Sequence, residues 1–161
     1  MKNLKQKEWV TGSKHHIDFS DVASVVLKYV DKGSKIFIGC DSFVSNRKIC
    51  FATTLCLYGG DEPGRYFFFK EKVPKRYYNQ LATRITEEAR RSLELAEFLK
   101  NEYKLKSNTM ELHLDISPTN ANNGTSKFSE MLKGLVIGSG FSCKIKPDAW
   151  ASQSIADRHS K

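Results

Sequence analysis

An aspartate at the end of a predicted buried strand is the first residue in this sequence that could do chemistry. Lys35–Ser42 reads K-I-F-I-G-C-D-S, in which apolar, β-favouring residues follow turn-forming ones. The pattern predicts a central strand that ends at Asp41. A buried carboxylate without a partner is costly, so Asp41 belongs at a sheet edge or in a site. Gly39, on the same face, leaves room for a ligand or another backbone. A turn or cap role for Asp41 is the alternative.

A second aspartate takes the same position in another predicted strand. Residues 110–116 read M-E-L-H-L-D-I, with apolar side chains on one face and Glu111, His113 and Asp115 on the other. If this strand lies parallel to the first, about 4.8 Å away, Asp41 and Asp115 emerge at the same edge and can share a cation. His113 either hydrogen-bonds a site carboxylate or is satisfied elsewhere, and we expect the second.

The third candidate is a glutamate on the longest helical pattern, over residues 77–101. At about 100° per residue the apolar side chains collect on one face, and Glu88 lies in the middle of it. Its neighbour Glu87 is predicted to point to solvent. A carboxylate among core-facing residues needs a partner. That partner is either a buried lysine or arginine, or the site of Asp41 and Asp115.

The three candidates offer only oxygen ligands, which select hard cations such as Mg²⁺ or Mn²⁺. At pH 7 such a cluster repels itself unless cations fill it. Two ions about 4 Å apart activate the attacking water and stabilise the leaving oxygen in phosphodiester hydrolysis. A zinc site built from the four cysteines and four histidines is the alternative, but their spacing matches no zinc motif.

A mixed α/β domain must position these side chains. After a loosely held leader over residues 1–18, the patterns predict one domain over residues 19–161. The expected helices cover 21–30, 77–101, 126–136 and 147 to the end, and the expected strands cover 35–41, 49–57, 65–72, 110–116 and 141–145. Short loops make an antiparallel meander of the first three strands, and crossovers add two parallel ones. The prediction is a five-stranded mixed sheet flanked by helices.

The helix predicted over residues 126–136 carries four apolar side chains that we expect to point inward. They are Phe128, Met131, Leu132 and Leu135.

The charge balance favours a polyanionic partner such as nucleic acid. The chain has 26 Lys+Arg against 18 Asp+Glu, a formal net charge of +8 and a pI of about 9.3. The predicted nucleic-acid contacts are a basic and aromatic cluster near the third strand and an asparagine in a later loop: Lys70, Lys72, Lys75, Arg76, Tyr77 and Asn120. Solvated lysines at a strand end are the alternative.

No hydrophobic stretch points to a membrane. No apolar run is long enough to span a bilayer, and the N-terminal residues show no apolar signal segment. We therefore expect a cytoplasmic protein, and no oligomeric state is predicted.

In their order along the chain, these residues resemble the ribonuclease H fold and its catalytic carboxylates. More closely, I-F-I-G-C-D-S, L-D-I-S-P and K-P-D-A-W-A-S-x-x-I-A-D resemble the YkuK-type bacterial family of ribonuclease-H-like proteins, from residue 36 to the C-terminus. The ending Q-S-I-A-D is similar to the N-x-x-A-D pattern of the last ribonuclease H helix, which implies that Asp157 is the fourth metal ligand. Gln153 stands in place of the usual Asn, and Asp148, about 180° around the helix, competes with Asp157.

The resemblance implies a nuclease acting on RNA or DNA with two Mg²⁺ or Mn²⁺ ions. Asp41 and Asp115 would bridge the ions, and Glu88 and Asp157 would complete one each. The alternative is a non-catalytic module that keeps the fold to bind nucleic acid or another protein. A third class, an actin-like sugar kinase or ATPase, needs two copies of a related fold and a phosphate-gripping glycine loop, neither of which this sequence contains.

Overall fold

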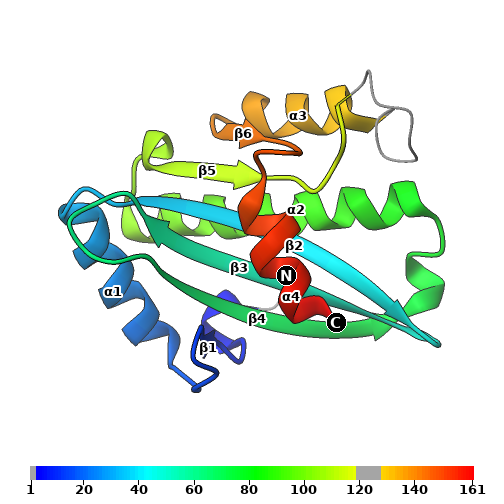
Figure 1. The fold of residues 1–161 in the computed structure, drawn as a ribbon, viewed down its shortest axis with the longest axis horizontal. Helices are drawn as coiled ribbons and strands as arrows, with labels where there is room; N and C mark the ends of the chain where they lie inside the picture. Colours follow the sequence, from blue (N-terminus) through cyan, green and yellow to red (C-terminus); the bar gives the residue numbers. More distant parts are fainter. Residues whose placement is uncertain (1–2, 119–127) are drawn as a thin grey trace.

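A six-stranded mixed sheet, in the order β1-β4-β3-β2-β5-β6, forms the centre of the protein. The structure is a computed structural model that describes residues 3–118 and 128–161. Figure 1 shows α1 and α2 behind the sheet and the C-terminal helical segment, in red, crossing its front. We call these two sides the back face and the front face. The predicted mixed α/β architecture is confirmed, with six strands in place of five.

Three long antiparallel strands form the middle of the sheet. They are β2 (Lys35–Ser45), β3 (Lys48–Tyr58) and β4 (Arg65–Pro74). β2 pairs with β3 along its whole length, and the hairpin turns at Asn46, whose φ of 54° is one that asparagine tolerates. The predicted meander is confirmed. The prediction that Asp41 ends its strand is wrong, because β2 continues to Ser45.

Two parallel strands with helical connections complete the other side of the sheet. In chain order these elements are α2 (Leu81–Tyr103), β5 (Met110–His113), α3 (Ser129–Gly138) and β6 (Ser142–Lys144). β5 lies parallel to β2 with His113 opposite Gly39, and β6 lies parallel to β5. Both parallel strands are as predicted but shorter. Since β5 pairs with β2 no further than Gly39, the rest of β2 has no strand on this side among the described residues.

The described part of the N-terminal segment, residues 3–18, belongs to the fold, which corrects its description as a loosely held leader. β1 (Val10–Thr11) pairs with the edge of β4. Trp9 is 1% exposed, donates from Nε1 to the Leu4 carbonyl oxygen at 2.9 Å, and packs edge-on against Phe69. A buried tryptophan with its N–H satisfied anchors the segment. One tryptophan in a polar stretch without periodicity gave no such signal.

Two helices on the back face enclose the main apolar core. α1 (Phe19–Asp31) begins after Asp18, whose side chain makes no capping hydrogen bond. α2 begins at Leu81 rather than at Tyr77, because Lys75–Tyr77 forms a short 3₁₀ turn after β4. Further 3₁₀ turns cover Leu4–Gln6 and Ser107–Thr109. None of the described helices is both long and apolar enough to traverse a lipid bilayer.

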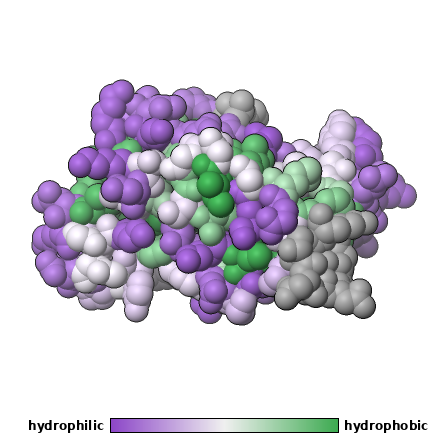
Figure 2. Space-filling view, turned by 90° about the horizontal axis from the view of Figure 1, so that it is seen from above, coloured by the Kyte–Doolittle hydropathy of each residue, from purple (hydrophilic) through white to green (hydrophobic). Residues whose placement is uncertain are grey.

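α3 packs on the core through a narrower stripe of apolar side chains than the sequence predicts. Leu132 and Val136 are buried, as their spacing of four residues allows. Met131 and Leu135, predicted to point inward, are 59% and 45% exposed. Figure 2 looks onto this side of the molecule, where hydrophobic side chains lie among hydrophilic ones. The helix contacts α2 and the edge strand β6, and Leu132 and Val136 are the residues buried there.

The C-terminal segment, predicted as one helix from residue 147, crosses the front face in two helical pieces. A π-helix over Ala151–Ala156 continues into α4 (Asp157–Ser160). Its backbone lies directly against Gly39 of β2, where an added Cβ would lie 2.5 Å from the Ser152 nitrogen. The space that the sequence predicts beside Gly39 is therefore filled by another backbone.

His113 holds the beginning of this segment. Its Nδ1 accepts a hydrogen bond from the Ala151 N–H at 3.0 Å, and its Nε2 lies 2.9 Å from Glu111 Oε1. Burial lowers the pKa of His113, which favours the neutral ring that such an acceptor requires. As the sequence led us to expect, the hydrogen bonds of His113 are made away from the candidate site carboxylates.

Gly39→Ala is expected to destabilise the protein by more than about 2 kcal/mol, since the new methyl group would have to displace backbone rather than a flexible side chain. Gly134→Ala in α3 is the matched control, because nothing lies within 4 Å of its Cβ and alanine favours the helix by up to about 1 kcal/mol. Urea unfolding measures both. A Gly39→Ala protein as stable as the wild type would mean that the C-terminal segment is not seated on β2.

Candidate active site

Asp41 lies on the front face of β2, at a point where, among the described residues, a paired strand lies on only one side of β2. It pairs with Ala52 of β3, and β5 has ended two residues earlier, opposite Gly39. Asp41 is 8% exposed, and its Oδ2 accepts a hydrogen bond from Ser160 Oγ at 3.1 Å. The sheet edge that the carboxylate requires is therefore created by the end of β5 and not by the end of β2.

Asp115 follows the end of β5 and lies in the same corner. Its negative charge contributes to raising the pKa values of both Asp41 and Glu88. Lys146 Nζ lies 3.0 Å from Asp115 Oδ1 in an ion pair. The contact is not aligned as a hydrogen bond, so this buried oxygen has no hydrogen-bond partner in the part of the chain that the structure describes. A buried acceptor without a partner is costly and marks a place for a ligand.

Glu88 reaches this corner from α2. It is 8% exposed, and its Oε2 accepts a hydrogen bond from Ser42 Oγ at 2.5 Å. The salt bridges considered for Glu88 are made by its neighbour, since Glu87 hydrogen-bonds Arg90 at 2.7 Å and Arg91 at 2.8 Å. Glu87 is 7% exposed, so the prediction that it points to solvent is wrong.

Arg91 explains why Glu87 is buried and how α2 is fixed. Its guanidinium lies 4.3 Å from the centroid of the Phe51 ring on the back face and donates to Glu71 of β4 at 2.5 Å. Lys7 also hydrogen-bonds Glu71. These contacts attach α2 to the sheet at the helical turn that also carries Glu88.

Asp157 begins α4 and lies next to Asp41. A hydrogen-bonded contact with Asp157 and the negative charge of that residue both raise the pKa of Asp41. Lys161 Nζ lies 3.2 Å from Asp157 Oδ2. Asp148 is exposed, and its charge acts on His113 instead. The structure thus brings Asp157 to Asp41, and it leaves Asp148 outside the group.

Crowded negative charge is the main electrostatic property of this corner, which we call the carboxylate corner (Asp41, Glu88, Asp115 and Asp157). Burial, with the charge of Asp115 next, raises the pKa of Asp41 from 3.8 to about 7. Burial, with the charge of Asp41 next, raises the pKa of Glu88 from 4.5 to about 8. Without a cation, the corner therefore holds protons near neutral pH.

The donor set fits a hard divalent cation in kind. The carboxylate corner offers oxygen ligands, and one buried oxygen of Asp115 has no hydrogen-bond partner among the described residues. Burial and neighbouring negative charge raise the pKa values of Asp41 and Glu88, and a cation would neutralise that charge. In residues 3–118 and 128–161, however, no three His, Cys, Asp or Glu side chains are close enough together to form a finished metal site. Lys146 and Lys161 already pair with two of the carboxylates, so a metal ion would have to displace them.

Two of the predicted nucleic-acid contacts lie on β4 beside this corner. Lys70 and Lys72 are exposed, and they alternate with the buried Phe69 and the half-buried Glu71 and Val73, which face the back. Lys70 acts on His159, whose ring stacks on Phe68 at 3.8 Å on the front face. Both lysines therefore project from the face that carries Asp41. Asn120 lies outside the described residues.

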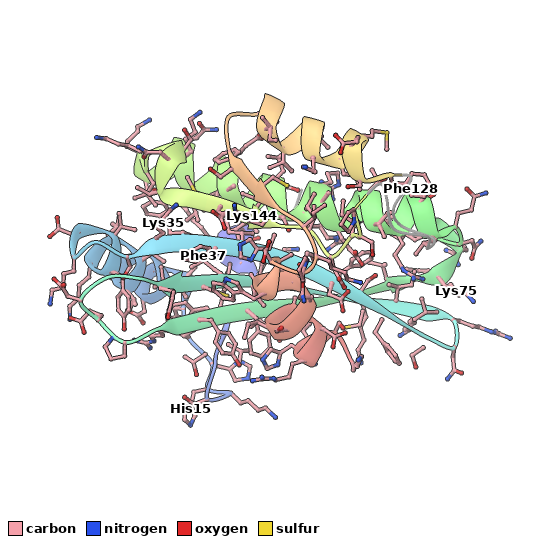
Figure 3. All side chains as sticks on the ribbon, turned by 45° about the horizontal axis from the view of Figure 1, so that its top comes forward. His15, Lys35, Phe37, Lys75, Phe128 and Lys144 are labelled. Atoms are coloured by element: carbon pink, nitrogen blue, oxygen red, sulfur yellow. The ribbon has the colours of Figure 1, made fainter. Side chains whose placement is uncertain are left out.

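The other predicted contacts, Lys75, Arg76 and Tyr77, form the exposed turn after β4. The Lys75 N–H donates to the Arg47 carbonyl oxygen at 2.8 Å, which places this turn beside the β2–β3 hairpin. Figure 3 shows Lys75 at one end of the molecule and Lys35 at the other. The basic residues of the turn thus lie beyond the carboxylate corner, at the hairpin end of the sheet.

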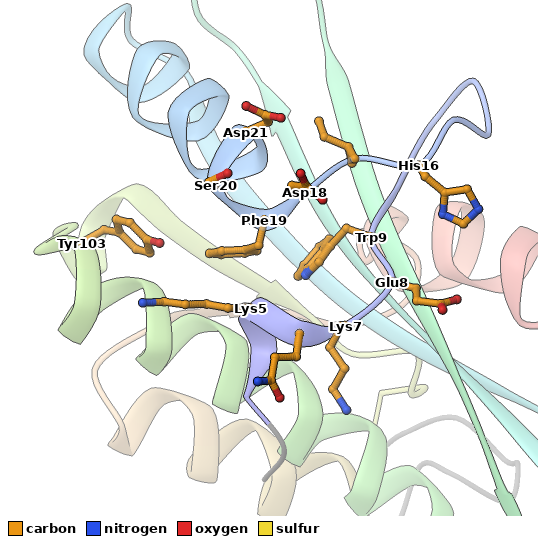
Figure 4. A pocket seen from close by; sticks show the side chains of 12 residues that line it. Lys5, Lys7, Glu8, Trp9, His16, Asp18, Phe19, Ser20, Asp21 and Tyr103 are labelled. Carbon is orange, nitrogen blue, oxygen red and sulfur yellow. The ribbon is translucent and has the colours of Figure 1, made fainter.

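A cavity of about 800 Å³ lies elsewhere. It is lined by the N-terminal segment, the start of α1 and Tyr103, as Figure 4 shows. None of the four carboxylates lines it, so this cavity is separate from the carboxylate corner.

Sequence reasoning missed the groups that contact the carboxylates, which are Ser42, Lys146, Ser160 and Lys161. Ser42 and Ser160 follow candidate aspartates closely in the chain, and Lys146 precedes the P-D pair of the third motif. The sequence shows that these residues are close to the candidates along the chain. It does not show where their side chains point, because that depends on strand pleating and on the π-helical turn.

In the absence of divalent ions, stability is expected to fall as the pH rises from about 4 to about 8. Asp41 and Glu88 have native pKa values of about 7 and about 8, above their ordinary values of 3.8 and 4.5, so in this interval the native state keeps protons that the unfolded state has released. This contribution is complete below pH ~4 and lost above pH ~8. Asp41→Asn/Glu88→Gln should remove it, gaining at least about 1 kcal/mol over wild type at pH 8.

Urea unfolding in EDTA at pH 5 and pH 8 measures this dependence, with Asp148→Asn as the control that keeps it. Equal pH dependence in the wild type and the double variant would contradict the electrostatics described here.

Comparison with known proteins agrees with this geometry. The family model described as ribonuclease H-like matches residues 18–161, which include the four carboxylates and the elements that carry them. No curated protein and no solved structure matches the chain. The family match covers most of the chain and agrees with the sheet and its crossovers. This chain therefore belongs to the ribonuclease H-like family.

Proposed function

We propose that this protein is a divalent-metal-dependent nuclease that hydrolyses phosphodiester bonds of RNA or DNA. The observation that carries the proposal is the carboxylate corner, where residues from β2, α2, the end of β5 and α4 influence one another's charge. Burying that much negative charge costs stability unless a ligand compensates for it. A nuclease that uses metal ions has a reason to keep it.

Each carboxylate has an assigned role in the proposal. Asp41 and Asp115 would be shared by two Mg²⁺ or Mn²⁺ ions, and Glu88 and Asp157 would each supply a further ligand to one of them. Bound ions of this kind activate water and stabilise the leaving oxygen of a phosphodiester. The hydroxyl groups of Ser42 and Ser160 orient Glu88 and Asp41 through the hydrogen bonds described above.

The surroundings of the carboxylate corner suit a polymeric anion. Lys70 lies level with Asp41, and Lys72 and the basic side chains of the following turn lie on the hairpin side of the corner. The net charge of +8 supports long-range attraction of a polyanion. In the proposal, Lys70, Lys72, Lys75 and Arg76 contact phosphates, Tyr77 stacks on a base and Asn120 approaches the substrate.

Asp41→Asn is expected to reduce cleavage by at least about 100-fold, because losing a metal ligand should cost more than losing an outer-shell partner. The assay offers RNA–DNA hybrid, branched DNA and single strands with Mg²⁺ or Mn²⁺. Asp148→Asn is the control, an exposed aspartate outside the corner, and should keep activity within about threefold of wild type. Failure to cleave any substrate, or cleavage insensitive to Asp41→Asn, would count against the nuclease.

A non-catalytic nucleic-acid-binding or protein-interaction module is the second candidate. The observation that favours it is that Lys146, Lys161 and Ser160 already contact the carboxylates. Such a module would bind nucleic acid without metal ions, and Asp41→Asn would leave its affinity unchanged or raise it by removing repulsion. Calorimetric titration with Mn²⁺ separates the two functions, since only the nuclease requires binding at the corner.

Lys146→Met is expected to tighten Mn²⁺ binding about two- to fivefold, because the ammonium group competes with the ion for Asp115 and a partly exposed ion pair of this kind contributes about 1 kcal/mol. Lys28→Met, an exposed lysine of α1, is the matched control. Calorimetry gives both affinities. Weaker Mn²⁺ binding by Lys146→Met would show that the lysine supports the metal site rather than competing for it.

A further inference from the structure

Past the carboxylate corner, the front face of the sheet continues toward the β2–β3 hairpin, where none of the described helices lies over it. Along β2, Phe43 and Ser45 follow Asp41 on this face, since side chains alternate along a strand. Phe43 is opposite Cys50 of β3, which is opposite Lys72 of β4. We call this surface the hairpin strip; its residues are Phe43, Ser45, Lys48, Cys50, Lys70 and Lys72.

The residues that alternate with those of the hairpin strip along each strand show which face of the sheet the strip lies on. Val44, Ile49 and Val73 pack in a small apolar cluster on the back face, together with Phe51. Phe43 must therefore point to the front, where it is 41% exposed. An exposed phenylalanine alone is ordinary. What distinguishes Phe43 is the set of groups that surrounds it.

The surroundings of Phe43 are hollowed and positively charged. A hollow of about 700 Å³ at the hairpin is lined by Ser45, Asn46, Arg47, Lys48, Cys50 and Lys72. In the part of the chain that the structure describes, the salt bridges involve none of Arg47, Lys48, Lys70 or Lys72. Four cations without acidic partners beside an exposed aromatic ring fit a flexible polyanion that carries flat apolar groups.

We propose that the hairpin strip binds a single-stranded segment of nucleic acid, with one base stacked on Phe43 and the neighbouring phosphates held by Lys70 and Lys72. This inference rests on the proposed function and gives its substrate a local form. A duplex keeps its base faces stacked inside the helix, so a ring on a flat sheet finds a partner only where a base is unpaired.

The register links the strip to the carboxylate corner. Phe43 follows Asp41 by two residues, a rise of about 6.6 Å along the strand. Lys70 is level with Asp41 through Ala52, and Lys72 is level with Phe43 through Cys50. The stacked base therefore belongs to a nucleotide adjacent to the phosphate at the carboxylate corner, and the strand leaves the corner toward the hairpin.

The test measures binding by fluorescence anisotropy with fluorescein-labelled 12-nucleotide single strands of DNA and RNA and with the matching duplexes. EDTA excludes metal-dependent hydrolysis. Phe43→Ala is expected to weaken single-strand binding at least about fivefold, as when one base loses an aromatic partner, and to change duplex binding less than twofold. Leu27→Ala on α1, equally exposed at 41%, is the matched control. Phe43→Trp should restore affinity.

The lysines supply a second readout. For a single strand, Lys72→Gln should make the negative slope of log affinity against log salt concentration shallower by about 0.7, because one phosphate contact is lost. Lys28→Gln should leave the slope unchanged. Single-strand affinity of Phe43→Ala within twofold of wild type, or equal losses for single strand and duplex, would overturn the inference. So would no binding of either strand by the wild type, which would leave the strip to a protein partner.

The outcomes separate this inference from the nuclease proposal. Phe43-dependent binding in EDTA without cleavage in Mg²⁺ or Mn²⁺ supports the strip and contradicts the nuclease. Cleavage by a protein whose binding does not depend on Phe43 contradicts the strip alone.

Discussion

Mutual repulsion among buried carboxylates is the constraint on which the rest of this structure depends. Asp41 and Glu88 are each 8% exposed and are held near Asp115, so that their pKa values rise to about 7 and about 8. Left to themselves, such groups would separate into water. They stay together because the backbone elements that carry them are fixed by contacts elsewhere. The repulsion is then relieved in part by protons, serine hydroxyl groups and two lysines.

Three features of the fold impose this arrangement. β5 ends opposite Gly39, which opens the side of β2 where Asp41 lies. The backbone of the C-terminal segment rests on Gly39, where a Cβ would clash, and this contact delivers Asp157 and Ser160. On the back face, Arg91 attaches α2 to the sheet through Glu71 and the Phe51 ring and so fixes the turn that carries Glu88. Each feature joins segments that are distant in sequence, and the carboxylate corner needs all three.

The sequence was most informative where periodicity is long and least informative where a contact spans elements. The apolar run of β3, the alternation in β5 and the helical spacing of α2 predicted the meander, the parallel strand and the crossover. Periodicity placed Glu88 correctly on the sheet-facing side of α2, but it assigned Glu87 to solvent because it could not foresee two arginine partners. The ion pair of Lys146 with Asp115 and the anchoring of Trp9 are products of tertiary packing, as is the point where β5 stops relative to β2.

The central claim is that the carboxylates gather at one corner in order to hold cations. A crystal structure of the protein soaked in Mn²⁺, with anomalous scattering recorded at the manganese edge, tests it most directly. The account predicts anomalous density between Asp41 and Asp115, ligation by Glu88 or Asp157, and Lys146 displaced from Asp115. Density absent from this corner at saturating Mn²⁺, with Lys146 still paired to Asp115, would contradict it.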